Sequence, residues 1–161
     1  MYIAGIMPVA RERLTTIPYD APLIEAAKLL SRAEVNLVVV CDSNALAGVI
    51  TRTDVVRQIS HCAGNSCTTA VSAVMTREVT CCRPEDLLTY VWSIMKERGL
   101  KHVPIVDKSA RPLGVLYARD ALQVLLREVE YEELLLRDYV MGVGYRWLFN
   151  TAVRPSTPAG Y

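Results

Sequence analysis

The chain of 161 residues contains no long apolar run. Its longest apolar stretches are short, such as Val35 to Cys41, and Asn36 interrupts that one. A membrane-spanning helix needs about 20 consecutive apolar residues, so none is predicted. The segment from Met1 to Arg13 also lacks the basic start and apolar stretch of a signal peptide. We therefore expect a cytoplasmic protein without a membrane partner.

The sequence also lacks an excess of charge of either sign, with 18 Lys and Arg against 17 Asp and Glu. The basic residues are scattered along the chain, so no nucleic-acid partner is indicated. Hydrophobic residues make up 52% of the chain. That share is enough to build a core and argues against disorder.

Familiar catalytic and metal-binding motifs are missing. The sequence has no P-loop, no metal-binding helix motif and no Ser-His-Asp arrangement, and it has only two histidines. The number of cysteines is odd and their spacing fits neither a disulfide scaffold nor a structural zinc site: Cys41, Cys62, Cys67, Cys81 and Cys82. We expect free thiols, no catalytic residue and no metal site. A cysteine-based metal or redox sensor stays open as a third hypothesis.

An internal repeat is the main signal in the sequence. The segment from Leu14 to Asp42 aligns without a gap on the segment from Val79 to Asp107. After one extra loop residue, Gly48 to Asp54 aligns on Gly114 to Asp120. Identities are few, but the order of apolar, turn and acidic positions is kept. Two copies of one supersecondary unit explain this match.

Each copy predicts the order strand, helix, strand, strand, helix. The first helix of each copy is amphipathic, with apolar residues at helical spacing at Leu23, Ala26, Ala27 and Leu30, and at Leu87, Val91, Ile94 and Met95. The later strands are rich in β-branched residues. The predicted strands are 14–17, 37–41 and 47–50 in the first copy, and 79–82, 103–106 and 113–116 in the second.

The helices that close the two copies, starting near Thr53 and Arg119, differ in length. The first is expected to end before the small, polar stretch from His61 to Thr69, which is predicted to be a linker. The second continues an apolar pattern through about Tyr139, and glycines 142 and 144 are expected to end it. Its apolar face needs a surface to pack on, which is either the first repeat or another chain. Residues 151–161 are expected to form a loosely held tail.

The segment from Gly48 to Asp54 lies where a strand becomes a helix. Such a helix start offers unpaired N–H groups and a partial positive charge, which suit a phosphate. An ionised Asp54 only accepts hydrogen bonds and can hold two ribose hydroxyls, while Thr51 can donate to a phosphate oxygen. The same two residues also fit a helix capping box, and this segment taken alone favours capping.

The second copy changes that balance. It keeps Asp120 but has Tyr117 where the first copy has Thr51, and a tyrosine cannot cap in this way. An acid retained without its capping partner favours a ligand, although an acid in a first turn also suits the helix dipole. Arg52 and Arg119 flank the acids and are candidates to pair with ligand phosphates or with nearby carboxylates.

These features together resemble the cystathionine-β-synthase (CBS) domain family. The resemblance rests on the order of elements, on the glycine-led segments that end in Asp54 and Asp120, and on the strand His102-Val-Pro-Ile-Val-Asp107. Met7-Pro8 and Val74-Met75-Thr76 are similar to the usual openings of its domains. The resemblance covers residues 5 to 130.

The resemblance implies an α+β fold with two β-α-β-β-α repeats in a pseudo-twofold pair and a long C-terminal helix. The expected divisions are repeat 1 at 5–61, a linker at 62–72, repeat 2 at 73–130, and the C-terminal helix extension and tail at 131–161. It also implies a regulatory, non-catalytic Bateman module with no required cofactor. Its ligands would be adenosine compounds such as AMP, ADP, ATP or S-adenosylmethionine, bound in the clefts between the repeats.

The site residues that the resemblance implies fall on both copies. The ribose-binding acids are Asp54 and Asp120, and the Ser/Thr position falls on Thr51 and Tyr117, the latter a departure that puts the second cleft in question. The remaining cleft positions fall on Asn36, Lys101, Thr15 and Thr80. The implied partners are a second copy of the chain and an unidentified effector protein. The alternative is a structural dimerisation or docking module whose clefts are filled by side chains.

Overall fold

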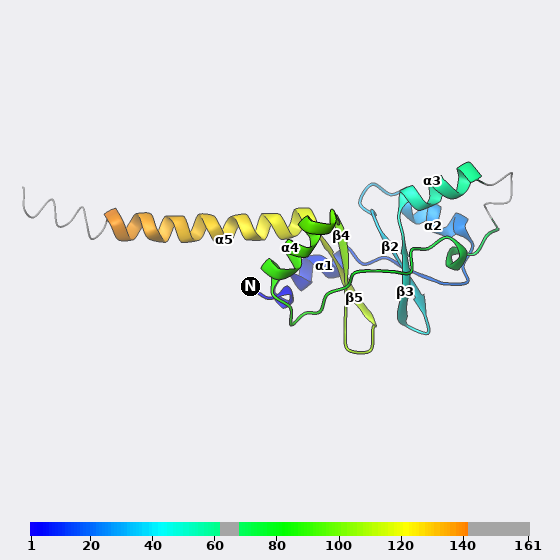
Figure 1. The fold of residues 1–161 in the computed structure, drawn as a ribbon, viewed down its shortest axis with the longest axis horizontal. Helices are drawn as coiled ribbons and strands as arrows, with labels where there is room; N and C mark the ends of the chain where they lie inside the picture. Colours follow the sequence, from blue (N-terminus) through cyan, green and yellow to red (C-terminus); the bar gives the residue numbers. More distant parts are fainter. Residues whose placement is uncertain (62–67, 142–161) are drawn as a thin grey trace, which may run out of the picture. The chain divides into compact units, whose positions relative to one another are not determined.

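The computed structural model describes residues 1–61 and 68–141 (Figure 1). The chain divides into two units by its contacts. The unit Met1–Leu122 contains both repeats, and the unit Gln123–Tyr161 contains most of the last helix. The cysteines at 62 and 67, the glycines at 142 and 144 and the predicted tail lie outside the described residues.

The first repeat has the predicted order of elements (Figure 1). Its three-stranded sheet has the order β1-β2-β3, with β1 parallel and β3 antiparallel to β2. The buried residues of α2 are Leu23, Ala26 and Leu30, at the helical spacing that the sequence shows. The elements are β1 (Thr16–Pro18), α2 (Leu23–Leu30), β2 (Val38–Asp42), β3 (Ala45–Ile50) and α3 (Arg52–His61).

The second repeat follows the same order with a weaker first strand. Its elements are α4 (Leu88–Arg98), β4 (His102–Val106), β5 (Pro112–Tyr117) and α5 (Ala118–Tyr139). In place of β1 it has a single parallel bridge between Cys82 and Ile105. The predicted extended segment 79–82 therefore pairs with β4 at one residue only.

The strand boundaries shift by one or two residues from the sequence-based expectation, and two helix boundaries differ as well. The helix α4 begins at Leu88, so Leu87 precedes it and is 48% exposed. The helix α3 includes His61, which was expected to lie beyond it. The end of α4 has a clear cause, since Gly99 caps it with a φ of 65°, a conformation that side chains rarely adopt. The predicted extent of α5 is confirmed.

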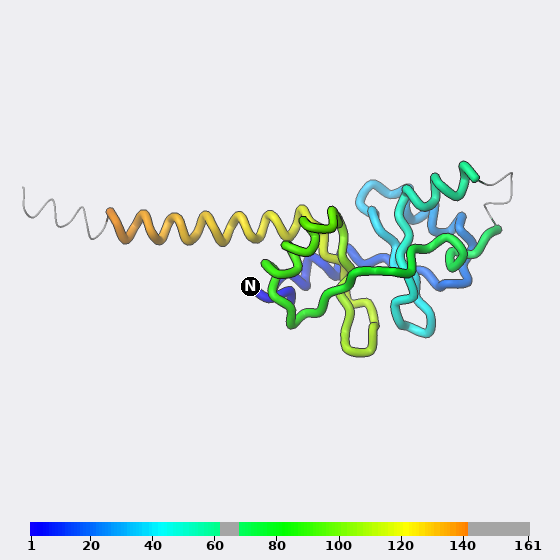
Figure 2. Tube along the Cα trace, in the orientation of Figure 1, coloured from blue at the N-terminus to red at the C-terminus, as the bar shows by residue number. Residues whose placement is uncertain are grey.

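Each repeat is covered by the segment that precedes the other repeat (Figure 2). The N-terminal elements η1 (Ile3–Ile6) and α1 (Met7–Glu12) come before repeat 1, and α1 packs on β5 of repeat 2. A Cβ atom at Gly114 would lie 2.8 Å from the carbonyl oxygen of Ala10, so only glycine permits this approach.

The reciprocal contact follows η2 (Val71–Ala73), the short helix before repeat 2. A Cβ atom at Gly48 would lie 2.7 Å from the carbonyl oxygen of Thr76. Val49 and Thr76 also exchange two backbone hydrogen bonds, of 3.0 and 2.9 Å. The two halves thus pack on each other through equivalent contacts, as a pseudo-twofold pair requires.

The strand β2 is buried on both faces. Val38 and Val40 belong to the core of the first repeat, together with Ile50 of β3. Val39, on the opposite face, packs in a second cluster with Val115 and Tyr117 of β5. Because both faces are covered, the strand is a continuous apolar run instead of an alternating one. In the described part of the chain, no helix has the length and apolar character that a membrane crossing requires.

Candidate functional site

The first acid, Asp54, lies in the first turn of α3 and is 9% exposed. Its Oδ2 atom accepts hydrogen bonds from the backbone N–H of Thr51 at 2.9 Å and from the Thr51 hydroxyl at 3.1 Å. Its Oδ1 atom lies 3.8 Å from Nη1 of Arg57, a side chain that is 67% exposed. The capping contact weighed from the sequence is therefore present, and it holds the carboxylate in one orientation.

A pocket of about 240 Å³ opens beside Asp54. It offers a carboxylate, a guanidinium, an amide and an imidazole, all from α3, and an apolar wall from the segment before repeat 2. The lining residues are Asp54, Arg57, Gln58, His61, Ala73 and Val74. Pockets for drug-sized ligands typically measure about 300–1,000 Å³, so this one suits a part of a nucleotide such as the ribose.

The second acid, Asp120, has a partner that lies 107 residues away in the sequence. Arg13 donates from Nε to Oδ2 and from Nη2 to Oδ1, both at 3.1 Å, in a two-pronged ion pair. The side chains are 26% and 12% exposed. The hydrogen bond to Asp120 raises the pKa of Arg13 above its ordinary value. The sequence favoured a ligand at this acid because its capping partner is missing, and the structure shows a protein partner, Arg13, bound to it.

Tyr117 fills the space next to this ion pair. Its side chain is 2% exposed, and the Arg13 guanidinium carbon lies 4.7 Å from the ring centroid. Its hydroxyl accepts a hydrogen bond from the backbone N–H of Asn36 at 3.3 Å and donates to the carbonyl oxygen of Glu34 at 3.4 Å. The ring of His102 packs edge-on against it, with centroids 4.5 Å apart. The side chain of Tyr117, which departs from the Ser/Thr pattern of the resemblance, is therefore packed among protein groups.

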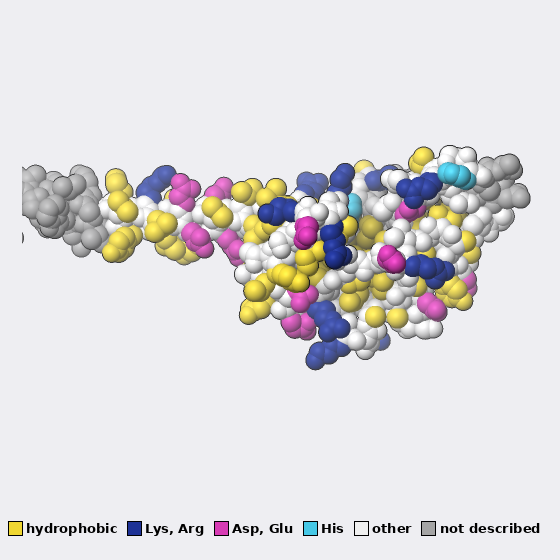
Figure 3. Space-filling view, in the orientation of Figure 1, with side chains coloured by type: hydrophobic (Ala, Val, Ile, Leu, Met, Phe, Trp, Pro, Cys, Tyr) yellow, Lys and Arg dark blue, Asp and Glu magenta, His cyan; other side chains and the backbone are white. Residues whose placement is uncertain are grey.

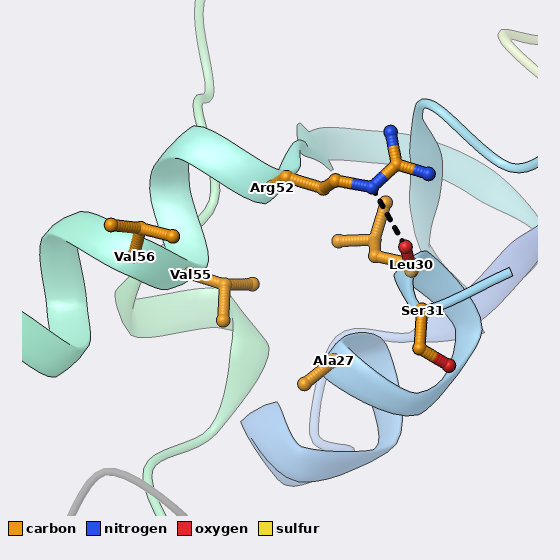
Figure 4. A pocket seen from close by; sticks show the side chains of 6 residues that line it. All are labelled: Ala27, Leu30, Ser31, Arg52, Val55 and Val56. Carbon is orange, nitrogen blue, oxygen red and sulfur yellow. Dashed lines mark hydrogen bonds between the residues drawn. The ribbon is translucent and has the colours of Figure 1, made fainter. Parts of the chain in front are cut away.

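Arg52 is a structural clamp at the end of α2. Its guanidinium donates to the carbonyl oxygens of Leu30 at 2.8 Å, Arg32 at 2.9 Å and Val35 at 2.7 Å, and to Oδ1 of Asn36 at 2.7 Å. These carbonyls belong to the last turn of a helix and the loop after it, where the hydrogen bonding of the helix ends. The carbonyl oxygen of Arg32 also accepts from the backbone N–H of Val35, at 3.2 Å. Figure 4 shows Arg52 reaching across from α3 to Leu30. The expectation that Arg52 pairs with a phosphate or a carboxylate is therefore corrected.

The other predicted positions are distributed around the two acids. Asn36 is held by both Arg52 and Tyr117. Thr80 accepts a hydrogen bond from Arg98 at 3.0 Å through its hydroxyl, and Thr15 accepts one from Val39 through its carbonyl. Lys101 and Arg119 are exposed, and neither side chain forms a hydrogen bond or ion pair with residues 1–61 and 68–141.

Two similar grooves lie between helices, one in each repeat. The first, of about 270 Å³, runs between α2 and α3 and is lined by Ala27, Leu30, Ser31, Arg52, Val55 and Val56 (Figure 4). The second, of about 240 Å³, lies between α4 and the start of α5 and is lined by Trp92, Met95, Lys96, Gly99, Leu100, Lys101 and Ala118. Both grooves are mainly apolar and suit a hydrophobic contact better than a nucleotide.

Reasoning from the sequence missed Arg13 and Arg57. Arg57 follows Asp54 by one helical turn, so its position beside the acid could have been inferred from the helix period. Arg13 has no local signal, because only the packing of α1 on β5 brings it to Asp120.

Three of the five cysteines lie in the described part of the chain. Cys41, Cys81 and Cys82 are free thiols, and burial raises the pKa of Cys82 to about 12. No group of three or more potential ligand side chains gathers among the described residues.

Comparisons with known proteins agree with the repeat organisation. The family model for the CBS domain matches residues 6–61 and 71–127. An uncharacterized 17.7 kDa protein from Acidianus ambivalens is 26% identical over 122 residues, which cover 75% of this chain and 73% of that protein. A homoserine O-acetyltransferase from Methanosphaera stadtmanae is 28% identical over 112 residues, or 69% of this chain, but the match spans only 22% of the enzyme.

One solved structure provides a comparison with bound ligands. The CBS domain pair of protein MJ0100, determined in complex with 5′-methylthioadenosine and S-adenosyl-L-methionine, matches with a TM-score of 0.66 and 22% identity. The match covers 80% of this chain and 98% of that one. At this level of identity the likeness shows a common fold.

Proposed function

The chain belongs to the CBS domain family as a tandem pair of CBS domains, and on this premise we propose that it is a regulatory module that binds an adenosine-containing ligand at Asp54. The observation that carries the proposal is the buried carboxylate of Asp54, held by Thr51 at the head of a helix beside a polar pocket. The module is proposed to be cytoplasmic, to have no catalytic activity and to act on an effector protein.

The pocket supplies a role for each part of such a ligand. Among the described residues, the Oδ1 atom of Asp54 has only the long contact to Arg57, so it can accept hydrogen bonds from ribose hydroxyls. The exposed guanidinium of Arg57 and the N-terminus of α3 suit a phosphate. Adenosyl ligands in the CBS pair of MJ0100 support this ligand class. Bound ligand would shift the packing of the repeats by its preference for one arrangement over another.

Binding of AMP, ATP and S-adenosylmethionine to protein stripped of small molecules tests the proposal. Calorimetry should detect binding of at least one of them, with a matching rise in melting temperature. Asp54→Asn keeps an oxygen that Thr51 can bond but removes the charge, and it should weaken binding by about tenfold or more, as loss of a charged hydrogen bond does.

Asp107→Asn is the matched control. The carboxylate of Asp107 accepts hydrogen bonds from the N–H groups of Ser109 and Arg111 in a turn outside the pocket, so its loss should leave affinity unchanged. Stripped protein that binds none of the three ligands at millimolar concentration would rule the proposal out.

A specific observation favours self-association as a second candidate function. Four apolar residues recur along one stripe of α5 at coiled-coil spacing and are 42–65% exposed: Leu122, Leu126, Val129 and Leu136. Figure 3 shows apolar side chains exposed along this helix. We propose that this stripe and the two interhelical grooves contact a second copy of the chain.

Light scattering of the full chain tests this candidate. Leu126→Glu with Val129→Glu should convert a dimer into a monomer, because the two charges would be buried at the interface. Glu130→Gln, on the same helix outside the stripe, is the control. A wild-type chain that is monomeric at all concentrations would exclude it.

A further inference from the structure

We infer that Arg13 permanently occupies both carboxylate oxygens of Asp120, the second acid, and so closes the cleft at Asp120 to a ribose. Each chain then binds one ligand, at Asp54. The inference deepens the proposed function and rests on it for the identity of the ligand class. It assigns Arg13 the role of a specificity-determining residue, which decides which of two equivalent sites is available.

The first step is the hydrogen-bonding capacity of Asp120. A carboxylate holds a ribose by accepting from two neighbouring hydroxyls, and at Asp120 both oxygens already accept from Arg13. A neutral diol would have to break two charge-assisted hydrogen bonds and leave the guanidinium without a counter-charge. Displacement is therefore unfavourable, and the fork geometry of arginine makes it more so.

The second step is the seal around the pair. Arg13 lies over the ring of Tyr117, and Tyr117 is anchored through Asn36, which is in turn held by Arg52. Removing Arg13 from Asp120 would also expose the face of a ring that is 2% exposed. The occupant is thus part of a continuous set of contacts that joins the two repeats.

The third step is the contrast with the first acid. Asp54 is held by Thr51 of its own turn through one oxygen. Within residues 1–61 and 68–141, the second oxygen has only the long contact to Arg57. In the alignment of the two copies, Arg13 falls on Glu78 and Tyr117 falls on Thr51. A glutamate cannot form such a pair with a carboxylate, so the sequence provides no occupant of this kind for Asp54.

Calorimetric stoichiometry tests the inference directly. Wild-type protein should bind one ligand per chain, and Asp54→Asn should weaken that binding while Asp120→Asn should leave it unchanged. The double variant Arg13→Ala, Tyr117→Thr removes the guanidinium from Asp120 and gives this acid the threonine of the first copy, and it should bind two. Two ligands per wild-type chain, sensitivity to Asp120→Asn, or a folded double variant that still binds one would each overturn the inference.

A ligand-independent measurement separates this inference from the proposed function. Unfolding of Arg13→Met, Asp120→Asn and the combined variant forms a double-mutant cycle. The combined variant should lose about as much stability as either single variant, because both break the same pair. Additive losses would mean that Arg13 does not occupy Asp120. If stripped wild-type protein binds no ligand while the cycle shows coupling, the proposed function fails and the occupancy of Asp120 stands.

Discussion

Asp54 and Asp120 occupy equivalent positions in the two repeats, yet their carboxylates have different partners. Asp54 is held by a residue of its own turn. Asp120 is held by Arg13, the residue that follows α1 at the opposite end of the unit's sequence. The same local segment therefore serves two purposes, and the residues that distinguish them lie outside it. An acid at a helix start should be judged by what the tertiary fold places against it.

The largest loss of stability should come from separating α1 from β5, since this packing brings Arg13 to Asp120. Gly114→Ala would place a methyl group 2.8 Å from the backbone of Ala10, which cannot move without displacing the helix that carries Arg13. We expect a loss of about 2–3 kcal/mol in the free energy of unfolding, measured in urea.

Gly5→Ala serves as the control for this change. Its added methyl group would meet only the flexible side chain of Met1, so stability should be nearly unchanged. Equal stability of the two variants would contradict the close packing of α1 on β5.

The next largest effect is expected at Arg52. Arg52→Met keeps the length of the side chain but removes the guanidinium that bonds three carbonyl oxygens and Asn36. It should lower the free energy of unfolding by about 2 kcal/mol. Arg119→Met, in the first turn of α5, should change it by less than about 0.5 kcal/mol. Thermal unfolding of both variants checks the difference, and equal losses would refute the clamp.

A smaller effect on stability is expected from replacing Arg13, the partner of Asp120. Arg13→Met should lower the free energy of unfolding by about 1–2 kcal/mol, since the pair is two-pronged but a quarter of the arginine side chain is exposed. Glu78→Met, at the aligned position of the other copy, should change it by less than about 0.5 kcal/mol. Chemical denaturation of the two variants compares their losses in the free energy of unfolding. Equal losses would contradict a stabilising ion pair at Asp120 that Asp54 does not have.

The smallest effect concerns pH. Burial, aided by Lys101 and Arg52, lowers the pKa of His102 below its ordinary value of 6.5. Below that pH the unfolded chain takes up a proton that the folded chain resists, so stability should fall as the pH decreases through 6.5.

The first repeat has Leu37 at the position that aligns with His102. His102→Leu should therefore reduce this pH dependence, with a difference of less than about 1 kcal/mol between pH 7.5 and 5.5. Unfolding curves at the two pH values check it, and an unchanged pH dependence would show that His102 is not its source.

Much of the fold could be predicted because its signals are local. The helical spacing of Leu23, Ala26 and Leu30 predicted a buried face, and these residues are buried. The β-branched residues of 37–41 predicted a strand, and β2 spans Val38–Asp42. The first strand of repeat 2 was predicted less well, because an extended segment pairs only where its neighbour allows it, and Cys82 alone forms a bridge.

The candidate site could be predicted only in part. The alignment of the two copies predicted an acid at Asp54 and at Asp120. It also showed that Tyr117 replaces the threonine of the first copy, which put a ligand in the second cleft in question. The roles of Arg52 and Arg13 do not, since each side chain binds partners far from it in the sequence. A long, flexible arginine can reach several acceptors, and the fold decides which of them lie within reach.

The sequence by itself determined the two repeats, their order of elements and the position of an acid at each helix start, because periodicity and turn chemistry act over a few residues. Only the tertiary structure decided that Asp54 faces a pocket and that Asp120 faces Arg13. The reason is that the exchange of α1 and η2 between the repeats brings distant segments together, and charges pair according to distance in space.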